Sequence, residues 1–298
     1  MEIALLSLSS CLGCQMVFLS LEEYLYELIG ENKVVYAPFL MDRREWDHAD
    51  LALVEGTVRN TEHFLRAREV REKADRVVAL GTCASFGGVQ GLADLYPESR
   101  LLRSRFGDTA FEGGPQGVKR LLPLDSFIRV DAYLPGCPPP VALMERFLRA
   151  AVAGDRLSRE GSTVCAECGV TSPPLPQPGP RRLTDGAGEP GKCLLESGFV
   201  CLGPLTRDGC GALCPTEMGV PCRGCRGPAG RVLERAGVDM EAETVRRLSR
   251  ATGKKEGEIR AEVADPPRTY YLFCLAEPLL RRRRSGGTSP YIHRLGEQ

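Results

Sequence analysis

The first half of the 298-residue chain predicts an α/β fold built on a doubly wound parallel sheet. Short, nearly continuous apolar runs alternate there with segments of helical periodicity, a pattern typical of parallel strands covered on both faces. The second observation is thirteen cysteines, eight of them within residues 165–230, where apolar periodicity is weak. We therefore expect a flavodoxin-like domain over residues 1–158 and a cysteine-rich, mostly irregular domain over residues 159–298.

The elements of the first domain follow from the spacing of its apolar residues. Residues 2–8 (EIALLSL) predict the first strand, and residues 15–30 predict the first helix. The later elements are expected in this order: strands at 33–41 and 50–58, a helix at 60–74, strands at 76–82 and 131–136, and a helix at 141–155. Residues 84–130 are rich in glycine, proline and charge, so we expect them to form a long insertion at the edge of the sheet.

The second domain has too little apolar periodicity to fold by burial alone. Residues 173–182 (PPLPQPGPRR) are incompatible with a helix interior or a central strand. Something other than an apolar core must therefore hold residues 165–230 together. Residues 239–263 are charged and predict helix, and the basic run at 281–284 is interpreted as a solvated segment.

Charge and composition exclude several classes of partner. Lysine plus arginine and aspartate plus glutamate both number 39, and aromatic residues make up only 6%, so a nucleic-acid partner is not indicated. No apolar run approaches the roughly 18 to 20 residues of a membrane span, and the N-terminus shows no export signal. We expect a cytoplasmic protein, in which thiols stay reduced and dense cysteine indicates metal rather than disulfides.

Four cysteines follow the carboxyl ends of predicted strands. Cys11 and Cys14 come after the first strand, Cys83 after the strand at 76–82, and Cys137 after the strand at 131–136. These strand ends share one edge of a parallel sheet, where ligands of open α/β folds bind. We call these four residues the sheet-edge set. Four thiolates suit either zinc or a 4Fe–4S cluster.

Glycines and one acid are expected beside the sheet-edge set. The glycines would let the backbone approach an inorganic core and offer N–H donors; they are Gly13, Gly81, Gly87, Gly88 and Gly136. Glu55 ends the third predicted strand at the same edge. Two interpretations of Glu55 remain open: a carboxylate that tunes a cluster or relays protons, or a helix cap.

The remaining cysteines form two further groups of four by chain order. The first tail set is Cys165, Cys168, Cys193 and Cys201, and the second tail set is Cys210, Cys214, Cys222 and Cys225. Two zinc sites are possible, but the ribbon spacing of roughly 15 to 20 residues between CxxC pairs is absent. Two cubane clusters fit the count. Neighbouring clusters of ferredoxin-type sequences exchange ligands, so a partition that differs from chain order remains open. Cys274 lies in an apolar stretch and is interpreted as a packed thiol, and the three histidines, His48, His63 and His293, are poor ligand candidates.

The cysteine motifs resemble those of a known family. CLGC after the first strand, GTCASFGG, LPGCPPP, GFVCLGPLTRDGC and PCRGCRGP look like the small subunit of nickel–iron hydrogenases over residues 1–230. The resemblance implies that the sheet-edge set holds the proximal cluster, the first tail set the distal cluster and the second tail set the medial cluster. Cys165 stands where exported members usually have histidine, and Cys214 supplies a fourth medial ligand that many of them lack. These departures look like the cytoplasmic group, similar to the non-deazaflavin-reducing type associated with heterodisulfide reductase, with a sulfhydrogenase-like member as a near alternative.

The resemblance implies an electron-transfer subunit with three 4Fe–4S clusters and no catalytic residue of its own. Hydrogen would be oxidised on a large subunit that carries the nickel–iron centre, and electrons would pass to an iron–sulfur or flavin acceptor subunit. Two alternatives remain. A complex-I-like iron–sulfur subunit shares the fold but typically has adjacent cysteines at its first site and one cluster. A zinc-stapled interaction scaffold would have no redox role.

Overall fold

The computed structural model describes residues 1–107, 115–155, 161–174, 176–234 and 239–281. Contacts divide the chain into two compact units, Met1–Arg159 and Glu160–Gln298, with a boundary one residue from the expected one. His293 and most of the basic run at 281–284 lie outside the described residues. Among the described residues, no helix is long and apolar enough to cross a membrane.

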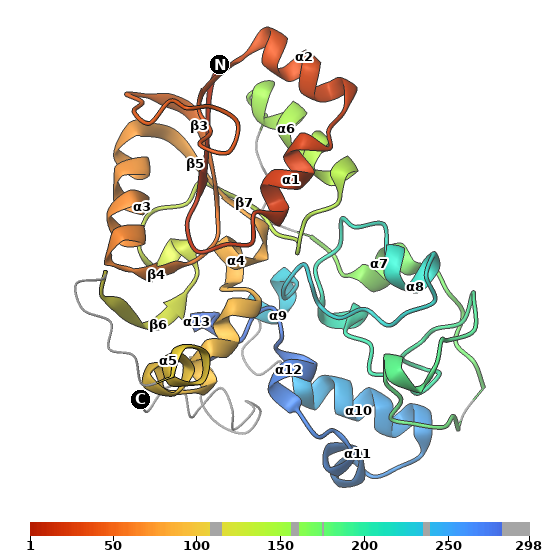
Figure 1. The fold of residues 1–298 in the computed structure, drawn as a ribbon. Coiled ribbons are helices and arrows are strands. Elements are labelled where there is room, and N and C mark those ends of the chain that lie inside the picture. The colour runs from red at the N-terminus through yellow and green to blue at the C-terminus, as the bar shows by residue number, and fades with distance from the viewer. Residues whose placement is uncertain (108–114, 156–160, 175, 235–238, 282–298) are drawn as a thin grey trace. The chain divides into compact units, whose positions relative to one another are not determined.

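The first unit is built on a five-stranded parallel sheet, as the sequence predicts (Figure 1). Its strands are β1 (Glu2–Ser7), β2 (Lys33–Tyr36), β3 (Ala49–Glu55), β5 (Ala74–Leu80) and β7 (Ala132–Leu134). They lie in the order β2-β1-β3-β5-β7, with all neighbouring pairs parallel. This is the flavodoxin-like order, in which the chain reverses its direction of winding at β1 and ligands bind beyond the carboxyl ends of the strands.

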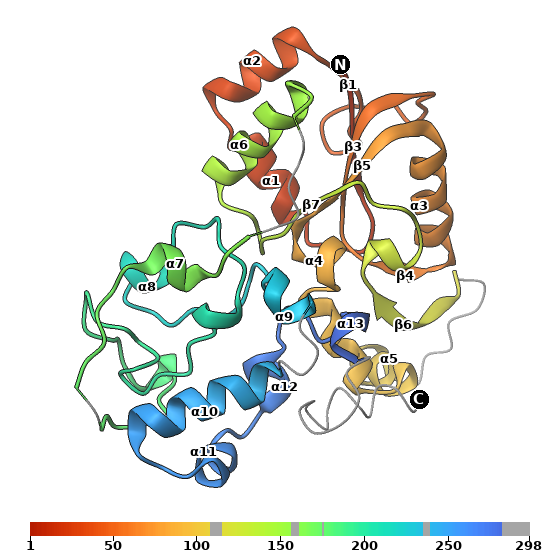
Figure 2. The same ribbon diagram turned by 180° about the vertical axis from the view of Figure 1, so that it is seen from behind.

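Both faces of this sheet are covered, which explains the continuous apolar strands. Helices α1 (Gly13–Leu19), α2 (Glu23–Glu31) and α6 (Val141–Val152) pack on one face, and α3 (Thr61–Lys73) covers the other (Figures 1 and 2). Successive residues of β1 alternate between the two cores, because side chains point to opposite faces of a strand. Ile3 and Leu5, both fully buried, face α1, α2 and α6. Truncating a leucine in such a core costs about 2–5 kcal/mol.

The prediction of a single helix over residues 15–30 is wrong. The chain breaks between α1 and α2, where Glu22 takes a φ of +50° that no helix interior contains. Phe18 in α1 and Leu28 in α2 are buried in the same core. The apolar spacing therefore runs on across the break and conceals it in the sequence.

The insertion at 84–130 contains regular structure that the sequence does not reveal. Its elements begin at the end of β5 and are α4 (Gly81–Phe86), η1 (Val89–Leu95), α5 (Glu98–Phe106), β6 (Gly117–Leu122) and η2 (Leu124–Ser126). Strand β6 pairs antiparallel with the short strand β4 (Val58–Asn60) in a second sheet. Helix α5 has no buried residue, so it carries no apolar periodicity from which a helix could be predicted.

The second unit is irregular in its cysteine-rich part and helical afterwards. Short elements connect its loops: α7 (Val164–Cys168), η3 (Leu183–Asp185), η4 (Gly203–Leu205), α8 (Leu213–Thr216) and α9 (Gly230–Glu234). The later helices are α10 (Met240–Thr252), α11 (Glu256–Glu262), α12 (Pro266–Tyr270) and α13 (Pro278–Arg281). The helix expected at 239–263 ends midway, because Gly253 adopts a left-handed C-cap conformation.

The later helices give the second unit a buried core. Phe199 from the cysteine-rich part is fully buried, and Tyr270, Tyr271 and Leu275 from the C-terminal part are at most 1% exposed. The Tyr271 hydroxyl donates a hydrogen bond to Asp239 at 2.8 Å, which satisfies a polar group in this core. Aromatic burial of this size dominates the energetics of small cores.

Candidate functional site

The turn after β1 presents two thiols at the carboxyl edge of the sheet. Cys11 is exposed, and Cys14 lies in the first turn of α1. Between them, Leu12 adopts a left-handed φ of +64°. The Leu12 N–H donates to the Ser10 hydroxyl at 3.3 Å. A non-glycine residue in this conformation stores local strain of a kind that clusters at functional sites.

The loops that carry Cys83 and Cys137 are joined by a pair of hydrogen bonds. The Thr82 N–H donates to the Gly136 carbonyl at 2.9 Å, and the Gly136 N–H donates to the Thr82 hydroxyl at 2.8 Å. Thr82 is 2% exposed, so both bonds are protected from water. Each bonded residue immediately precedes a cysteine, and the pair therefore fixes the two thiols relative to each other.

The structure brings the four thiols of the sheet-edge set together. Burial raises the pKa of Cys14, and the negative charges of Glu55, Cys83 and Cys137 raise it further. The pKa of Cys83 rises to about 12, through burial and then the charges of Cys137 and Cys11. Burial and Cys11 raise the pKa of Cys137. The raised pKa values favour the protonated thiols, and a metal or cluster bound among them would release these protons and stabilise the thiolates.

Three of the expected glycines lie directly against these sulfurs. A Cβ at Gly81 would stand 2.3 Å from Cys14 Sγ, and one at Gly88 would stand 2.6 Å from Cys83 Sγ. At Gly13 the distance to Cys11 Sγ would be 3.3 Å. Gly87 and Gly136 have other roles. Gly87 is the left-handed C-cap of α4, and Gly136 packs on the backbone of Pro139.

Glu55 is buried beside the sheet-edge set and does not cap a helix. It is 1% exposed and accepts hydrogen bonds from the Ser10 hydroxyl at 2.9 Å and the Ser7 hydroxyl at 3.3 Å. The cap of α3 is Asn60, whose side chain accepts from the His63 N–H. The helix-cap interpretation is therefore wrong, and the carboxylate acts on Cys14 through its charge.

Sequence reasoning missed Gln90, which lies in the insertion. Its Nε2 donates to the Ser9 carbonyl at 2.6 Å, and its Oε1 accepts from the Ser9 hydroxyl at 2.7 Å and the Thr57 hydroxyl at 3.2 Å. A hydrogen bond from Gln90 also lowers the pKa of Cys83, against the larger effect of burial. Gln90 thus ties the Cys11 turn to the Cys83 loop, and no local motif marks it.

The first tail set gathers in the second unit. The pKa of Cys165 rises to about 11, through burial and then the charges of Cys193 and Cys168. The pKa of buried Cys201 rises to about 12, with Cys165 and Cys193 among the causes after burial. A Cβ at Gly203 would lie 3.2 Å from Cys165 Sγ and 3.6 Å from Cys201 Sγ. This close backbone approach repeats the arrangement at the sheet edge.

The second tail set lies beside the first. Burial raises the pKa of Cys214, and the charge of Cys210 raises it further. Burial also raises the pKa of Cys222, with Cys201 as the next cause and Cys225 a smaller one. The Cys222 N–H donates to Cys201 Sγ at 3.3 Å. One hydrogen bond therefore connects a residue of each set.

No three thiol sulfurs of one set lie as close together as the ligands of a single metal ion. A tetrahedral zinc site of four thiolates, with Zn–S bonds of about 2.3 Å, holds its sulfurs about 3.8 Å apart. Among the described residues, which include every cysteine, the only three or more His, Cys, Asp or Glu ligand atoms all within 4.8 Å of one another belong to His48, Asp50 and Asp75. Each thiolate of a cubane binds a different iron, so its sulfurs lie farther apart.

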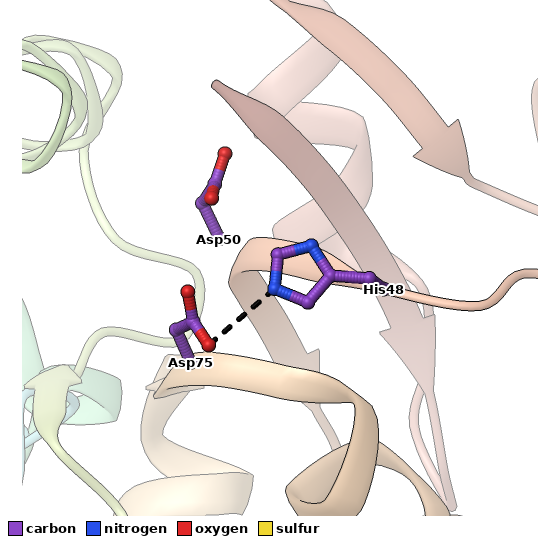
Figure 3. Close-up of side chains that lie close together, drawn as sticks. All are labelled: His48, Asp50 and Asp75. Carbon is purple, nitrogen blue, oxygen red and sulfur yellow. Dashed lines mark ion pairs between the residues drawn. The ribbon is translucent and has the colours of Figure 1, made fainter.

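That single close group contains no thiol and lies at the opposite edge of the sheet (Figure 3). Asp50 and Asp75 are near the amino ends of β3 and β5. His48 Nε2 lies 3.4 Å from Asp75, and its Nδ1 lies 3.6 Å from Glu2. These exposed contacts become ion pairs when the imidazole is protonated, which the raised pKa of His48 favours.

Cys274, interpreted from the sequence as a packed thiol, is confirmed as one. It is 2% exposed, and its Sγ lies 3.6 Å from Met240 Sδ in the helical core of the second unit. All thirteen cysteines are free thiols. Cys274 stands apart from the sets of four and has no role in the candidate site.

Comparison with known proteins covers both parts of the chain. The family described as NADH ubiquinone oxidoreductase, 20 Kd subunit, matches residues 11–151. That match stops before the first tail set and therefore does not account for the second unit. Full-length relatives do include the tail.

Three similar proteins are hydrogenases. A subunit of the F420-non-reducing hydrogenase vhu of Methanocaldococcus jannaschii is 33% identical over 95% of this chain and 97% of its own length. The corresponding subunit from Methanococcus voltae is 36% identical over 78% of this chain and 84% of its own length. The structure of the NiFeSe hydrogenase of Dm. baculatum shares the fold, with a TM-score of 0.50 and 18% identity over 76% of this chain and 94% of that chain. The chain belongs to the same family as these two F420-non-reducing hydrogenase subunits and is the iron–sulfur small subunit of a nickel–iron hydrogenase.

Proposed function

We propose that this subunit carries electrons from hydrogen oxidation through three 4Fe–4S clusters, one in each cysteine set. The proposal is supported by the gathering of the sheet-edge set and of the first tail set, with the second tail set represented by the neighbouring pairs Cys210–Cys214 and Cys222–Cys225. No three of these sulfurs lie within 4.8 Å of one another, as they would around a single ion. Glycines against the sulfurs leave room for an inorganic core at the sheet edge and at the first tail set. A 4Fe–4S cluster supplies one-electron transfer at a potential set by its protein surroundings.

The chain's own residues would hold each cluster and exclude water from it. The Thr82–Gly136 bonds and Gln90 would fix the sheet-edge ligands. Glu55 would place a buried negative charge beside Cys14, which favours the oxidised cluster because reduction adds negative charge. In the tail, the Cys222 N–H bond to Cys201 Sγ would give electrons a short path between two clusters.

We infer that the hydrogen-splitting nickel–iron centre is on a large subunit that docks at the sheet-edge set. Leu12 and Met16, which flank that set, are 44% and 58% exposed. A hollow of about 250 Å³ opens beside Leu12 and is lined also by Gln15, Tyr36 and Phe39. Exposed apolar side chains around a hollow are typical of a protein interface.

The acceptor is proposed to be an iron–sulfur or flavin subunit rather than coenzyme F420. The relatives are named F420-non-reducing hydrogenases. In the proposed path, electrons would reach the clusters of the tail sets after that of the sheet-edge set. Purified anaerobically with its large subunit and supplied with hydrogen, the subunit should reduce viologen dye but not F420. Direct reduction of F420 by this two-subunit enzyme would contradict the proposed class of acceptor.

Iron analysis of the hydrogenase complex tests the cluster count. Three cubanes require about twelve irons and twelve acid-labile sulfides in this chain. The Cys11→Ala and Cys137→Ala variants should abolish hydrogen-dependent dye reduction and the sheet-edge EPR signal, whereas Cys274→Ala should retain both. Colourless protein with zinc in place of iron and sulfide would show that the zinc-scaffold alternative is correct. Iron confined to the first unit would favour the complex-I-like alternative.

A further inference from the structure

The side chain of Glu167 connects the segment that carries Cys165 and Cys168 to the segment that carries Cys210. Glu167 lies between Cys165 and Cys168 of the first tail set. Its Oε1 accepts a hydrogen bond from the Gly209 N–H at 2.8 Å, and its Oε2 lies 4.0 Å from Cys210 Sγ, in the second tail set. The Glu167 side chain is therefore placed beside a proposed cluster ligand.

A buried positive charge belongs to the same part of the second unit. Arg226 follows Cys225 in the chain and is only 5% exposed. Burial lowers the pKa of Arg226, and the charges of Cys210, Cys225, Asp208 and Glu167, in that order, act against it. Arginine stays protonated in proteins, so the charge is permanent. At this burial, screening by solvent and salt is weak.

We propose that Glu167 and Arg226 form an opposed charge pair that sets the reduction potential of the second tail site relative to the first. The inference rests on the proposed function, since it requires a cluster at the second tail set. Adding one electron makes a cluster more negative. A buried cation beside it then stabilises the reduced form, and an adjacent carboxylate stabilises the oxidised form.

The placement of Glu167 makes the effect unequal between the two sites. The Glu167 carboxylate lies in α7 with the first tail set, but its Oε2 is 4.0 Å from Cys210 Sγ of the second. Arg226 follows Cys225 of the second set, and the charges of Cys210 and Cys225 affect its pKa. Both residues therefore act most strongly on the second tail site. The difference in potential between the two sites decides which of them holds the electron, and so determines whether transfer between them runs downhill.

The substitutions Glu167→Gln and Arg226→Gln test this inference in the purified hydrogenase complex. A glutamine at 167 keeps an oxygen that can accept from the Gly209 N–H, so the loop contact persists while the charge is lost. Redox titration followed by EPR gives the potential of each site. We expect Glu167→Gln to raise the potential of the second tail site and Arg226→Gln to lower it. Each substitution should change the ratio of reduced to oxidised cluster at least tenfold, which corresponds to a shift in potential of about 59 mV for one electron.

Controls separate charge from structure. Arg226→Lys retains the cation and should keep the wild-type potential, and the Glu167→Gln/Arg226→Gln double variant should lie between the two singles. Lys254→Gln and Glu262→Gln remove the two charges of an exposed ion pair in the same unit and should leave both tail potentials unchanged.

Two outcomes would overturn the inference. Shifts in the same direction for Glu167→Gln and Arg226→Gln would show that the residues act by holding the loops. Shifts smaller than twofold would show that their charges do not reach the site. If Arg226→Gln loses its iron, the potential of the second tail site in Glu167→Gln alone tests the inference. A wild-type complex with no cluster at the second tail set would instead refute the proposed function itself.

Discussion

At the scale of single residues, the glycines decide whether a thiol can approach an inorganic core. Gly81 has a φ of +79°, and a Cβ there would stand 2.3 Å from Cys14 Sγ. Gly154 has nearly the same φ, +77°, but nothing lies within 4 Å of its Cβ position. An alanine at either position would cost about 1–2 kcal/mol because of its left-handed backbone conformation. Only at position 81 would its Cβ also clash with Cys14 Sγ.

We therefore expect Gly81→Ala to displace Cys14 and lose the iron of the sheet-edge set, about four of twelve atoms. Gly154→Ala should keep all its iron and lose only stability. Iron and acid-labile sulfide analysis of the two variants measures this difference. Equal iron in both would mean that the close approach of Gly81 to Cys14 does not matter for metal binding.

His48, at the edge of the sheet opposite the sheet-edge set, gives a prediction that depends on pH. The pKa of His48 is raised above its usual 6.5, first by Asp75 and then by Glu2 and Asp50. Because the folded pKa is raised, protonated His48 favours the fold below pH 6.5. That contribution is lost as pH rises through the folded pKa. The His48 side chain is 48% exposed, which keeps the effect on stability small.

Asp75→Asn should therefore lower the pKa of His48, which an NMR titration of the imidazole measures directly. His63 provides an internal control, because burial rather than a partner acid lowers its pKa. Its titration should be unchanged in the variant. An unaltered His48 titration would show that the ion pair drawn in Figure 3 does not persist in solution.

At the scale of elements, the break between α1 and α2 is the clearest departure from the sequence pattern. Glu22 holds a φ of +50°, which glycine adopts without steric cost. Leu21 before it is buried and Glu22 itself is exposed, so the break is set by the backbone rather than by packing of the Glu22 side chain. A continuous helix would place residue 22 in the right-handed region, where glycine is unfavourable.

Glu22→Gly should leave the free energy of unfolding unchanged or raise it by up to about 1 kcal/mol, because relief of the left-handed strain exceeds the added entropy of the unfolded chain. Glu69→Gly, in the exposed face of α3, should lower it by about 1 kcal/mol. Urea unfolding of the full chain, followed by circular dichroism, compares the two variants. Equal destabilisation would indicate that residue 22 lies in a helix.

At the scale of the whole molecule, the sequence predicts those site residues whose position follows from a general rule of the fold. Cysteines after β1, β5 and β7 are expected to share one edge, because every parallel strand ends there, and the structure places them together. Gln90 follows no such rule. It reaches the Cys11 turn only because an insertion without apolar periodicity folds back on it. Thr82 is equally hidden, since its bonds to Gly136 join residues 54 positions apart.

The same limit applies to the fold. The strands of the sheet are visible because both of their faces are buried. Helix α5 buries no residue, and the break at Glu22 leaves the apolar spacing intact, so neither appears in the pattern. Apolar periodicity in a sequence indicates which residues are buried. A helix that buries no residue, or a break that leaves the apolar spacing unchanged, can be recognised only in the three-dimensional structure.

The division of the chain into two compact units leads to a last prediction about how the clusters depend on one another. The sheet-edge set belongs entirely to Met1–Arg159, whereas both tail sets share the second unit and are linked by the Cys222 N–H bond to Cys201 Sγ. Distant sites without shared partners act additively, and sites that share a bond do not.

A Cys83→Ala/Cys137→Ala variant should therefore lose about four irons while the EPR signals of both tail sites remain. Cys165→Ala/Cys201→Ala should disturb both tail sites, because loss of Cys201 Sγ leaves the buried Cys222 N–H without its acceptor. Cys165→Ala/Cys168→Ala removes two ligands of the same set but keeps that acceptor, so it should disturb the second tail site less, and only through the Glu167 contacts with Gly209 and Cys210. Loss of the tail signals in the first variant would mean that the two units do not fold independently, and equal damage in the other two would mean that the bond between the tail sets carries no coupling.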